Sequence, residues 1–261
     1  MRSFPPLKLK VRKFLKTKMA EERLQKVLSK LGFGSRRDCE KIIAAGRVRV
    51  NQMVAKLGDK ADPVKDAISV DGSLQKIKLP EKIYIAFNKP RKVLSDTKKP
   101  DDRKIVTDFV KVTDYLFIVG RLDYDSEGLV LLTNDGDAAN RLTHPRYEHE
   151  KEYLVELGRQ PDNEQLVIWR NGVVMEDGYR TMPAQVEIQA KEKSGRWIRV
   201  VLREGKKRQI REIGERIGLP IKRIIRKRIG PLELGALKPG EWRRLSSEEI
   251  SKLNKSLNRS A

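Results

Sequence analysis

GRLDYDSEGLVLLTNDG, residues 120–136, gathers four carboxylates around a short apolar run: Asp123, Asp125, Glu127 and Asp135. The run 129–132 is typical of a buried strand, and Asp135 is placed to end that strand and to open a helix over 136–143. The whole chain nevertheless carries 57 Lys and Arg against 36 Asp and Glu, a formal net charge of +21. A cluster of acidic residues is unexpected in so basic a chain, and it therefore calls for a specific explanation.

The bulk composition narrows the class of protein. Its 261 residues suffice for one large or two medium domains. The excess of positive charge indicates a polyanion as partner, although a merely soluble basic protein has the same composition. A single cysteine, Cys39, excludes an internal disulfide and suits a reducing compartment. No apolar run approaches the ~20 residues that cross a membrane.

The N-terminal residues 1–19 are basic and contain no acid. They lack the continuous apolar stretch of a secretory signal. We expect a disordered basic arm; an organellar presequence, or residues upstream of a true start at Met19, are the alternatives.

A first unit is expected over residues 20–80. Leu24, Val27 and Leu28 begin an apolar helical face, and Ser35 with Asp38 has the spacing of a capping box that opens a second helix. The alternation in RVRVN (47–51) and in AISVDG (67–72) predicts half-buried strands. A linker is expected at 78–80.

This order of GSRR (34–37) and GRVRVN (46–51) resembles the S4 RNA-binding domain. The resemblance implies that the unit binds RNA, and a helix N-terminus rich in arginine already favours phosphate. The basic side chains expected on this RNA-binding surface are Arg36, Arg37, Lys41, Arg47 and Arg49.

A second unit is expected over residues 81–245, followed by a basic tail, 246–261, that forms a fraying surface helix. Apolar, β-prone segments occur at 84–90, 115–120, 186–190 and 197–202, and helical patterns at 104–111, 136–143 and 209–217. No regular strand–helix–strand period is present. The pattern therefore predicts an α+β fold with a largely antiparallel mixed sheet and flanking helices.

Three interpretations of the acidic stretch compete. The spacing of oxygens in DYDSEG (123–128) resembles the start of a calcium loop, but the twelfth position is Asn134, which offers no bidentate carboxylate. A structural role suits Asp135 and the apolar run. Neither explains Asp123, because an isolated carboxylate in an RNA-binding cleft repels RNA unless chemistry requires it.

The same stretch resembles the signature of pseudouridine synthases of the RsuA/RluB type, in which the aspartate of GRLD is catalytic. The similarity continues through HPRYEHEKEYLV (144–155), LREGKKRQIRE (202–212) and RIGPLELGALKPGEWRRL (228–245), and with the S4 unit it covers residues 21–245. One departure is Lys92, where relatives often have glycine; it affects the shape of a loop.

The resemblance implies isomerisation of uridine to pseudouridine in RNA, with no cofactor and no metal. Asp123 would act on the sugar, Tyr153 would stack on the flipped uracil, and Arg121 would displace the base or bind phosphate. Lys206, or alternatively Arg208, would pair with Asp123. Leu202 would form an apolar wall of the pocket.

The implied partner is ribosomal RNA or a pre-ribosomal particle, with a uridine of the large subunit favoured. We expect a cytoplasmic monomer without a membrane partner. Two other functions remain open on the sequence: a non-catalytic S4-type protein that binds ribosomal RNA or assists ribosome assembly, and a nucleoside glycosylase.

Overall fold

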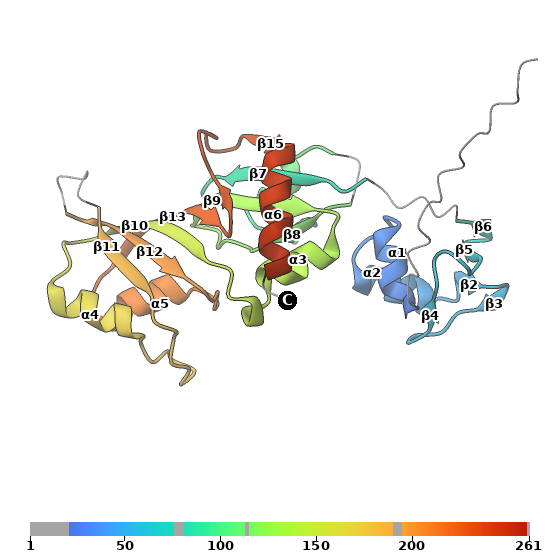
Figure 1. The fold of residues 1–261 in the computed structure, drawn as a ribbon, viewed down its shortest axis with the longest axis horizontal. Helices are drawn as coiled ribbons and strands as arrows, with labels where there is room; N and C mark the ends of the chain where they lie inside the picture. The colour runs from blue at the N-terminus through green and yellow to red at the C-terminus, as the bar shows by residue number, and fades with distance from the viewer. Residues whose placement is uncertain (1–20, 76–80, 113–114, 190–194, 260–261) are drawn as a thin grey trace, which may run out of the picture. The chain divides into compact units, whose positions relative to one another are not determined.

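The computed structural model describes residues 21–75, 81–112, 115–189 and 195–259, and the chain divides into two compact units at residues 79/80 (Figure 1). The expected basic arm (1–19) and linker (78–80) lie outside the described residues.

The first unit contains two helices, α1 (Leu24–Lys30) and α2 (Arg36–Ala44), and two small antiparallel sheets. One sheet pairs β1 (Glu22–Arg23) with β4 (Lys60–Ala61). The other has the order β3-β2-β5-β6, formed by Met53–Val54, Val48–Val50, Ile68–Val70 and Ser73–Leu74. The expected helix–helix–strand order is therefore present.

Local sequence explains these elements. The Ser35 side chain accepts from the Asp38 N–H at 3.1 Å, and the Asp38 carboxylate accepts from the Ser35 N–H at 3.2 Å, which is the predicted capping box. The apolar face of α1 is buried against α2 and the strands. Cys39 lies in this core, where burial raises the pKa of its thiol to about 11. The thiol is therefore neutral, as its helical context predicts.

The second unit is built on a nine-stranded sheet of order β11-β12-β10-β13-β9-β7-β15, with β14 beside β13 and β8 beside β9. In chain order the strands are β7 (Tyr84–Lys89), β8 (Phe117–Val119), β9 (Glu127–Thr133), β10 (Lys151–Leu157), β11 (Gln185–Ile188), β12 (Trp197–Leu202), β13 (Ile221–Ile229), β14 (Leu232–Glu233) and β15 (Trp242–Arg244). The unit is α+β, as the sequence predicts.

A parallel pairing joins the two halves of this sheet. Ile225 pairs with Glu127 and Arg226 with Gly128, whereas the other pairs of named strands in the described chain are antiparallel. Gly128 has φ +104°, and a Cβ there would lie 2.3 Å from the Arg226 carbonyl oxygen. Only glycine allows the backbones of β9 and β13 to approach so closely.

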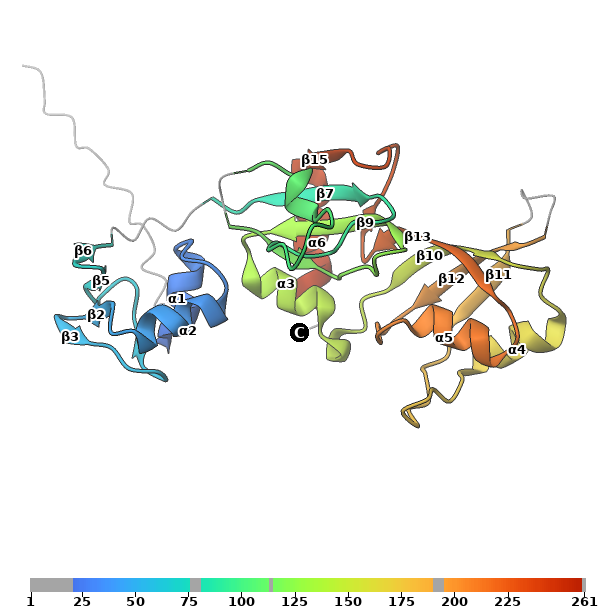
Figure 2. The ribbon, with the colours of Figure 1, turned by 180° about the vertical axis from the view of Figure 1, so that it is seen from behind.

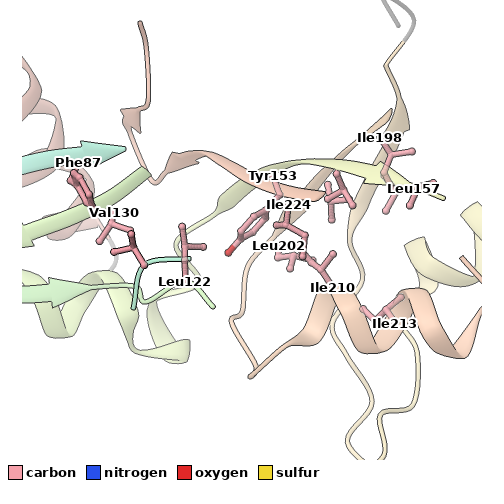
Figure 3. Packing of buried hydrophobic residues seen from close by; sticks show 14 of the residues in the cluster. Phe87, Leu122, Val130, Tyr153, Leu157, Ile198, Leu202, Ile210, Ile213 and Ile224 are labelled. Carbon is pink, nitrogen blue, oxygen red and sulfur yellow. The ribbon is translucent and has the colours of Figure 1, made fainter. Parts of the chain in front are cut away.

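Each half of the sheet has two helices beside it. Both ribbon views place α3 (Gly136–Thr143) and α6 (Ser247–Arg259) beside β7 to β9, and α4 (Asn163–Asn171) and α5 (Gln209–Arg216) beside β10 to β13 (Figures 1 and 2). Two short 3₁₀ turns, η1 (Val106–Asp108) and η2 (Pro145–Tyr147), complete the elements. The larger core cluster runs through both halves of the sheet, from Phe87 to Ile198 (Figure 3).

Two expectations need correction. The segment 104–111 forms only the single turn η1 rather than a helix. The C-terminal residues form α6, which does not fray as a surface tail: Leu253 and Leu257 are buried in the second core cluster, with Ile250 packed against it. Their spacing of three and four residues places them on one helical face, which the basic composition obscured.

No helix in the described parts of the chain is both long and apolar enough to span a bilayer.

Candidate active site

Asp123 lies in the connection between β8 and β9, and hydrogen bonds fix the backbone on both sides of it. The hydroxyl of Ser95 accepts from the Leu122 N–H at 3.0 Å and donates to the Leu122 carbonyl at 2.7 Å. The Ser126 N–H donates to the Asp123 carbonyl at 3.0 Å, closing a turn. The carboxylate is therefore presented from a well-defined loop, as a reacting group requires.

Lys89, at the end of β7, contacts the loop that carries Asp123: its ammonium lies 3.5 Å from the Tyr124 carbonyl oxygen. Its side chain is fully buried, and its ammonium donates to the carbonyls of Val93 at 2.7 Å and Pro90 at 3.0 Å. Burial lowers the pKa of Lys89 to about 8, and the negative charges of Asp123, Glu127 and Asp125 partly offset that effect. A buried positive charge thus lies close enough to the acidic stretch to interact with three of its carboxylates.

Lys92, which stands where relatives often have glycine, is accommodated in the loop. Its backbone adopts φ +62°, and its N–H donates to the Tyr124 carbonyl at 2.8 Å. Its ammonium forms an ion pair with Asp125 at 2.8 Å and lies 5.2 Å from the centre of the Tyr124 ring. These contacts oppose the strain of a left-handed lysine.

A cavity of about 610 Å³ opens beside this loop and is lined mainly by three parts of the second unit. The main parts are the 120–126 loop, one face of β10, β12 and β13, and the turn that leads into α5; residues 94–96 and Thr143 complete the lining. Six residues singled out from the sequence all line it: Arg121, Asp123, Tyr153, Leu202, Lys206 and Arg208. Residues more than 80 positions apart in sequence are thus brought to one place.

Tyr153 and Leu202 form the apolar side of the cavity. They are 8% and 3% exposed, and in Figure 3 the Tyr153 ring lies between Leu122 and the pair Leu202 and Ile224. The register of β10 against β12 pairs Tyr153 with Val200, so that Tyr153 and Leu202 come from neighbouring positions of the same surface. Arg121, by contrast, is exposed at the cavity.

The expected ion pair between Lys206 and Asp123 is absent from the described chain. The Lys206 ammonium instead lies 3.7 Å from the centre of the Tyr179 ring. Arg208 is exposed and has φ +55° immediately before α5. This left-handed turn redirects the chain between Lys206 and the helix, which residue spacing alone does not reveal.

Arg211, in the first turn of α5, is the arginine that sequence reasoning missed here. Its guanidinium donates to the Asp125 carbonyl at 3.4 Å, and its Nε is buried without a partner in the described chain. Burial lowers the pKa of Arg211, while the charges of Asp123 and Asp125 raise it. The spacing from Arg208 to Arg211 offered a signal, since residues three apart share a helical face.

Arg226 is a second residue that sequence reasoning missed. It is 1% exposed, its Nε donates to the Leu129 carbonyl at 2.7 Å, and its Nη2 donates to the Gly120 carbonyl. Burial lowers its pKa, and the neighbouring Tyr153 hydroxyl opposes that effect. Arg226 thus ties the start of the Asp123 loop to the centre of the sheet.

Glu204 anchors the turn before α5. Its buried carboxylate accepts from the Tyr179 hydroxyl at 2.7 Å, the Met182 N–H at 2.8 Å and the Gln209 amide at 2.7 Å. These bonds join the 179–182 loop to the first residue of α5, so Glu204 fixes this wall of the cavity.

The remaining acids of the 120–136 stretch serve the fold. Glu127 begins β9 and forms an ion pair with Arg223. Asp135 caps α3, accepting from the Ala138 N–H at 3.1 Å and from the Tyr84 hydroxyl at 2.8 Å. Within the described ranges no three His, Cys, Asp or Glu side chains converge as metal ligands would.

In the first unit, all five predicted RNA-binding side chains are exposed: Arg36, Arg37, Lys41, Arg47 and Arg49. The first three lie on α2; Arg47 directly precedes β2, and Arg49 lies within it. Arg47 forms a bidentate pair with Asp71 at 2.6 and 2.8 Å, so part of its charge is already compensated.

Comparisons with known proteins agree with this arrangement. Residues 83–214 match the family model for RNA pseudouridylate synthase, and residues 22–68 match that for the S4 domain. An RNA pseudouridine synthase of Aquifex aeolicus is 39% identical over 92% of this chain and 96% of its own length. The ribosomal large subunit pseudouridine synthase B of Bacillus subtilis is 39% identical over 89% and 95%.

A solved structure described as a pseudouridylate synthase superposes with a TM-score of 0.64 at 28% identity, covering 88% of this chain and 99% of its own. The chain therefore belongs to the RNA pseudouridylate synthase family and is an enzyme that isomerises uridine in RNA, with an S4 RNA-binding domain preceding the residues that match the synthase model.

Proposed function

We propose that the protein converts specific uridines of large-subunit ribosomal RNA to pseudouridine and that Asp123 is its catalytic carboxylate. The large-subunit target is supported by relatives that bear this activity in their names, such as those of Bacillus subtilis and Pseudomonas aeruginosa. The enzyme would act in the cytoplasm on ribosomal RNA or on pre-ribosomal particles. We further propose that it acts as a monomer.

The observation that carries the proposal is that the Asp123 carboxylate has no hydrogen-bond or ion-pair partner in the described chain. Two carboxylates line the cavity, and Asp96 accepts from the N–H groups of Thr97 and Lys98 in its own turn. Asp123 makes no side-chain hydrogen bond or ion pair within the described chain, although cations line the cavity around it. An ionisable group left without protein partners in a cationic cavity is placed to meet a substrate.

The cavity suits an unstacked nucleotide. Its volume lies in the range of small-ligand sites, and Tyr153 with Leu202 and Leu122 provides an apolar surface on which a pyrimidine can stack. The target uridine must leave its stack, at a cost of a few kcal/mol that is lowest in loops and bulges. Arg121 would occupy the vacated space or bind a neighbouring phosphate.

In the proposed reaction the N1–C1′ bond breaks, the uracil rotates, and a C5–C1′ bond forms. Asp123 either adds to C1′ or removes the adjacent sugar proton; both begin from the same position. The family pairs its aspartate with a cation, and the contacts of Arg211 support it in that role rather than Lys206. Lys206 and Arg208, both exposed, would instead contact the RNA backbone.

The first unit would hold the RNA through phosphate contacts. Arg36, Arg37 and Lys41 are exposed on α2, and Arg49 is exposed on β2. Such contacts position RNA without reading its sequence. Selection of the uridine would then depend on the cavity and on the shape of the surrounding RNA.

The test compares Asp123→Asn with Asp125→Asn on ribosomal RNA from cells that lack the gene. General-base or nucleophile removal costs about 10²–10⁴ in rate, so Asp123→Asn should lose at least about 10²-fold while still binding the RNA. Asp125→Asn removes a neighbouring carboxylate that is already paired with Lys92, and it should lose far less.

Mass spectrometry of the digested RNA separates the possible activities. Isomerisation leaves the mass of the RNA unchanged but yields a uridine isomer that reacts with acrylonitrile. Loss of a base would indicate a glycosylase, and no change with wild-type enzyme would indicate a non-catalytic RNA-binding protein. Wild-type rates in Asp123→Asn would refute the assigned role.

A further inference from the structure

Lys151 is a buried ammonium on the wall of the cavity, on the same face of β10 as Tyr153. It is 8% exposed, and β10 places it directly opposite Leu202. The two-residue spacing between Lys151 and Tyr153 corresponds to about 7 Å along a strand. A nucleobase stacked on Tyr153 would therefore lie within reach of the lysine side chain.

The ammonium is only partly satisfied by the protein. Its one hydrogen bond within the described chain goes to the His149 carbonyl at 3.0 Å. Because an ammonium has three N–H groups, two donors are left without a protein partner. Unfilled donors on a buried cation cost stability, which makes such a group a candidate for contact with a ligand.

Among the described residues, no carboxylate forms an ion pair with Lys151. The nearest acid in electrostatic terms, Glu204, already accepts from the Tyr179 hydroxyl, the Met182 N–H and the Gln209 amide. On the other side, Arg226 adds a second positive charge. Burial and Arg226 lower the pKa of Lys151 to about 8, so it remains charged at neutral pH.

The other cations of the cavity are arranged for different tasks. Arg226 donates to the Gly120 and Leu129 carbonyls and also interacts with the Tyr153 hydroxyl. Arg211 interacts with Asp123 and Asp125, and Lys206 lies on the Tyr179 ring. Lys151 combines burial, proximity to Tyr153 and unfilled donors.

We propose that Lys151 hydrogen-bonds a carbonyl oxygen of the target uracil and stabilises the negative charge that the base acquires when its bond to the sugar breaks. This role rests on the proposed function. The electron pair of the N1–C1′ bond moves onto the uracil and spreads over N1, O2 and O4. The electron deficiency left at C1′ is relieved in one of two ways. Either an Asp123 oxygen forms a bond to C1′, or the proton on the sugar carbon next to C1′ is transferred to Asp123.

The base then returns through C5. An electron pair of the base forms the C5–C1′ bond. In the first route this displaces the Asp123 oxygen from C1′; in the second, Asp123 returns its proton to the sugar carbon from which it came. The C5 proton then passes to water, and N1 takes up a proton from water, so that the product is an isomer of uridine. No oxidant or co-reactant is needed. Lys151 donates hydrogen bonds throughout and transfers no proton, so a charged, fixed donor is sufficient.

The experiment uses Lys151→Met and Lys151→Gln in the full-length chain, with Lys227→Met as a matched control. Lys227 follows Arg226 on β13 but is exposed. Single-turnover rates are measured at saturating enzyme on a transcript that spans a uridine modified by the wild-type enzyme. RNA affinity and Tm are measured for every variant.

Removing one such donor from a transition-state site costs about 10²–10³-fold in rate. Lys151→Met should lose about that much with RNA affinity unchanged, and Lys151→Gln, which keeps a neutral donor, should lose less. Lys227→Met should keep the wild-type rate. The Tm of Lys151→Met should equal or exceed that of wild type, because an unsatisfied buried charge has been removed.

A second substrate separates leaving-group stabilisation from packing. In a transcript made with 5-fluorouridine, fluorine makes the leaving base more acidic and thus less dependent on the enzyme. The loss caused by Lys151→Met, measured as cleavage of the N1–C1′ bond in one turnover, should therefore shrink on this transcript.

An equal loss on both transcripts, a lowered Tm with proportionate loss, or an unchanged rate would each overturn the role assigned to Lys151. These outcomes leave the proposed function standing, since the wild-type enzyme still forms pseudouridine. Failure of the proposed function itself would be seen in the wild-type reaction.

Discussion

Replacing Arg226 with methionine should both destabilise the second unit and displace the loop that carries Asp123. Its guanidinium donates to the Leu129 carbonyl in the central strand β9 and to the Gly120 carbonyl at the start of the loop. Methionine fills much of the same volume but donates nothing. The substitution therefore removes the link between sheet and loop without opening a large cavity.

The magnitude follows from the groups left behind. Each buried carbonyl that loses its partner costs about 1–3 kcal/mol, and two of them give about 2–6 kcal/mol. Relief from burying a guanidinium offsets part of this cost. We expect a loss of about 2–4 kcal/mol in the free energy of unfolding, which lowers the Tm by roughly 5–15 °C for a unit of this size.

The catalytic loss should exceed what stability explains. At a temperature where Arg226→Met is fully folded, release of the Gly120 carbonyl should shift the loop and reduce the single-turnover rate by about 10²-fold. Arg226→Lys is the matched control: it keeps the charge but not the planar fork, and should recover only part of the loss. Wild-type Tm and rate in Arg226→Met would refute the argument.

Three further predictions concern other parts of the chain. Gly128→Ala should destabilise by more than about 2 kcal/mol in chemical denaturation because its Cβ meets the β13 backbone, whereas Gly178→Ala, with a similar positive φ but open space, should cost less. Arg36→Ala with Arg37→Ala should weaken RNA binding and reduce the slope of log affinity against log salt by about 2; an unchanged slope would exclude this surface. Lys89 has a pKa lowered to about 8 in the folded state, so the unfolded chain binds more protons between about pH 8 and pH 10.5. The unfolding free energy of wild type minus that of Lys89→Met should therefore rise with pH across this window, and a flat difference would contradict the assignment.

The elements that could be predicted from the sequence are those set by local chemistry. The capping box of α2 and the cap of α3 by Asp135 involve residues within three positions of each other. Ser246 and Glu249 likewise exchange hydrogen bonds at the start of α6. The strand segments 84–89 and 197–202 follow from apolar, β-prone composition alone.

The parts that escaped prediction depend on contacts between distant segments. The parallel pairing of β13 with β9 joins residues about 100 positions apart, and Arg226 gains its role only through it. Lys206 was assigned to Asp123 by its place in a motif. The left-handed backbone at Arg208 and the ring of Tyr179 decide where its charge goes instead.

The four acids of the 120–136 stretch thus have separate tasks. Asp125 and Glu127 form ion pairs that hold the loop and the first residue of β9, and Asp135 caps α3. Asp123 has no such partner in the described chain, and it faces a cavity in a strongly basic protein. The positive charge attracts RNA, and the unpaired carboxylate is left for chemistry.

The most direct test of the central claim is to map pseudouridine in ribosomal RNA from cells that lack the gene, complemented with wild type or with Asp123→Asn. We predict that at least one large-subunit pseudouridine disappears on deletion, returns with wild type and does not return with Asp123→Asn expressed at the same level. Full restoration by Asp123→Asn, or an unchanged pattern on deletion, would contradict the account.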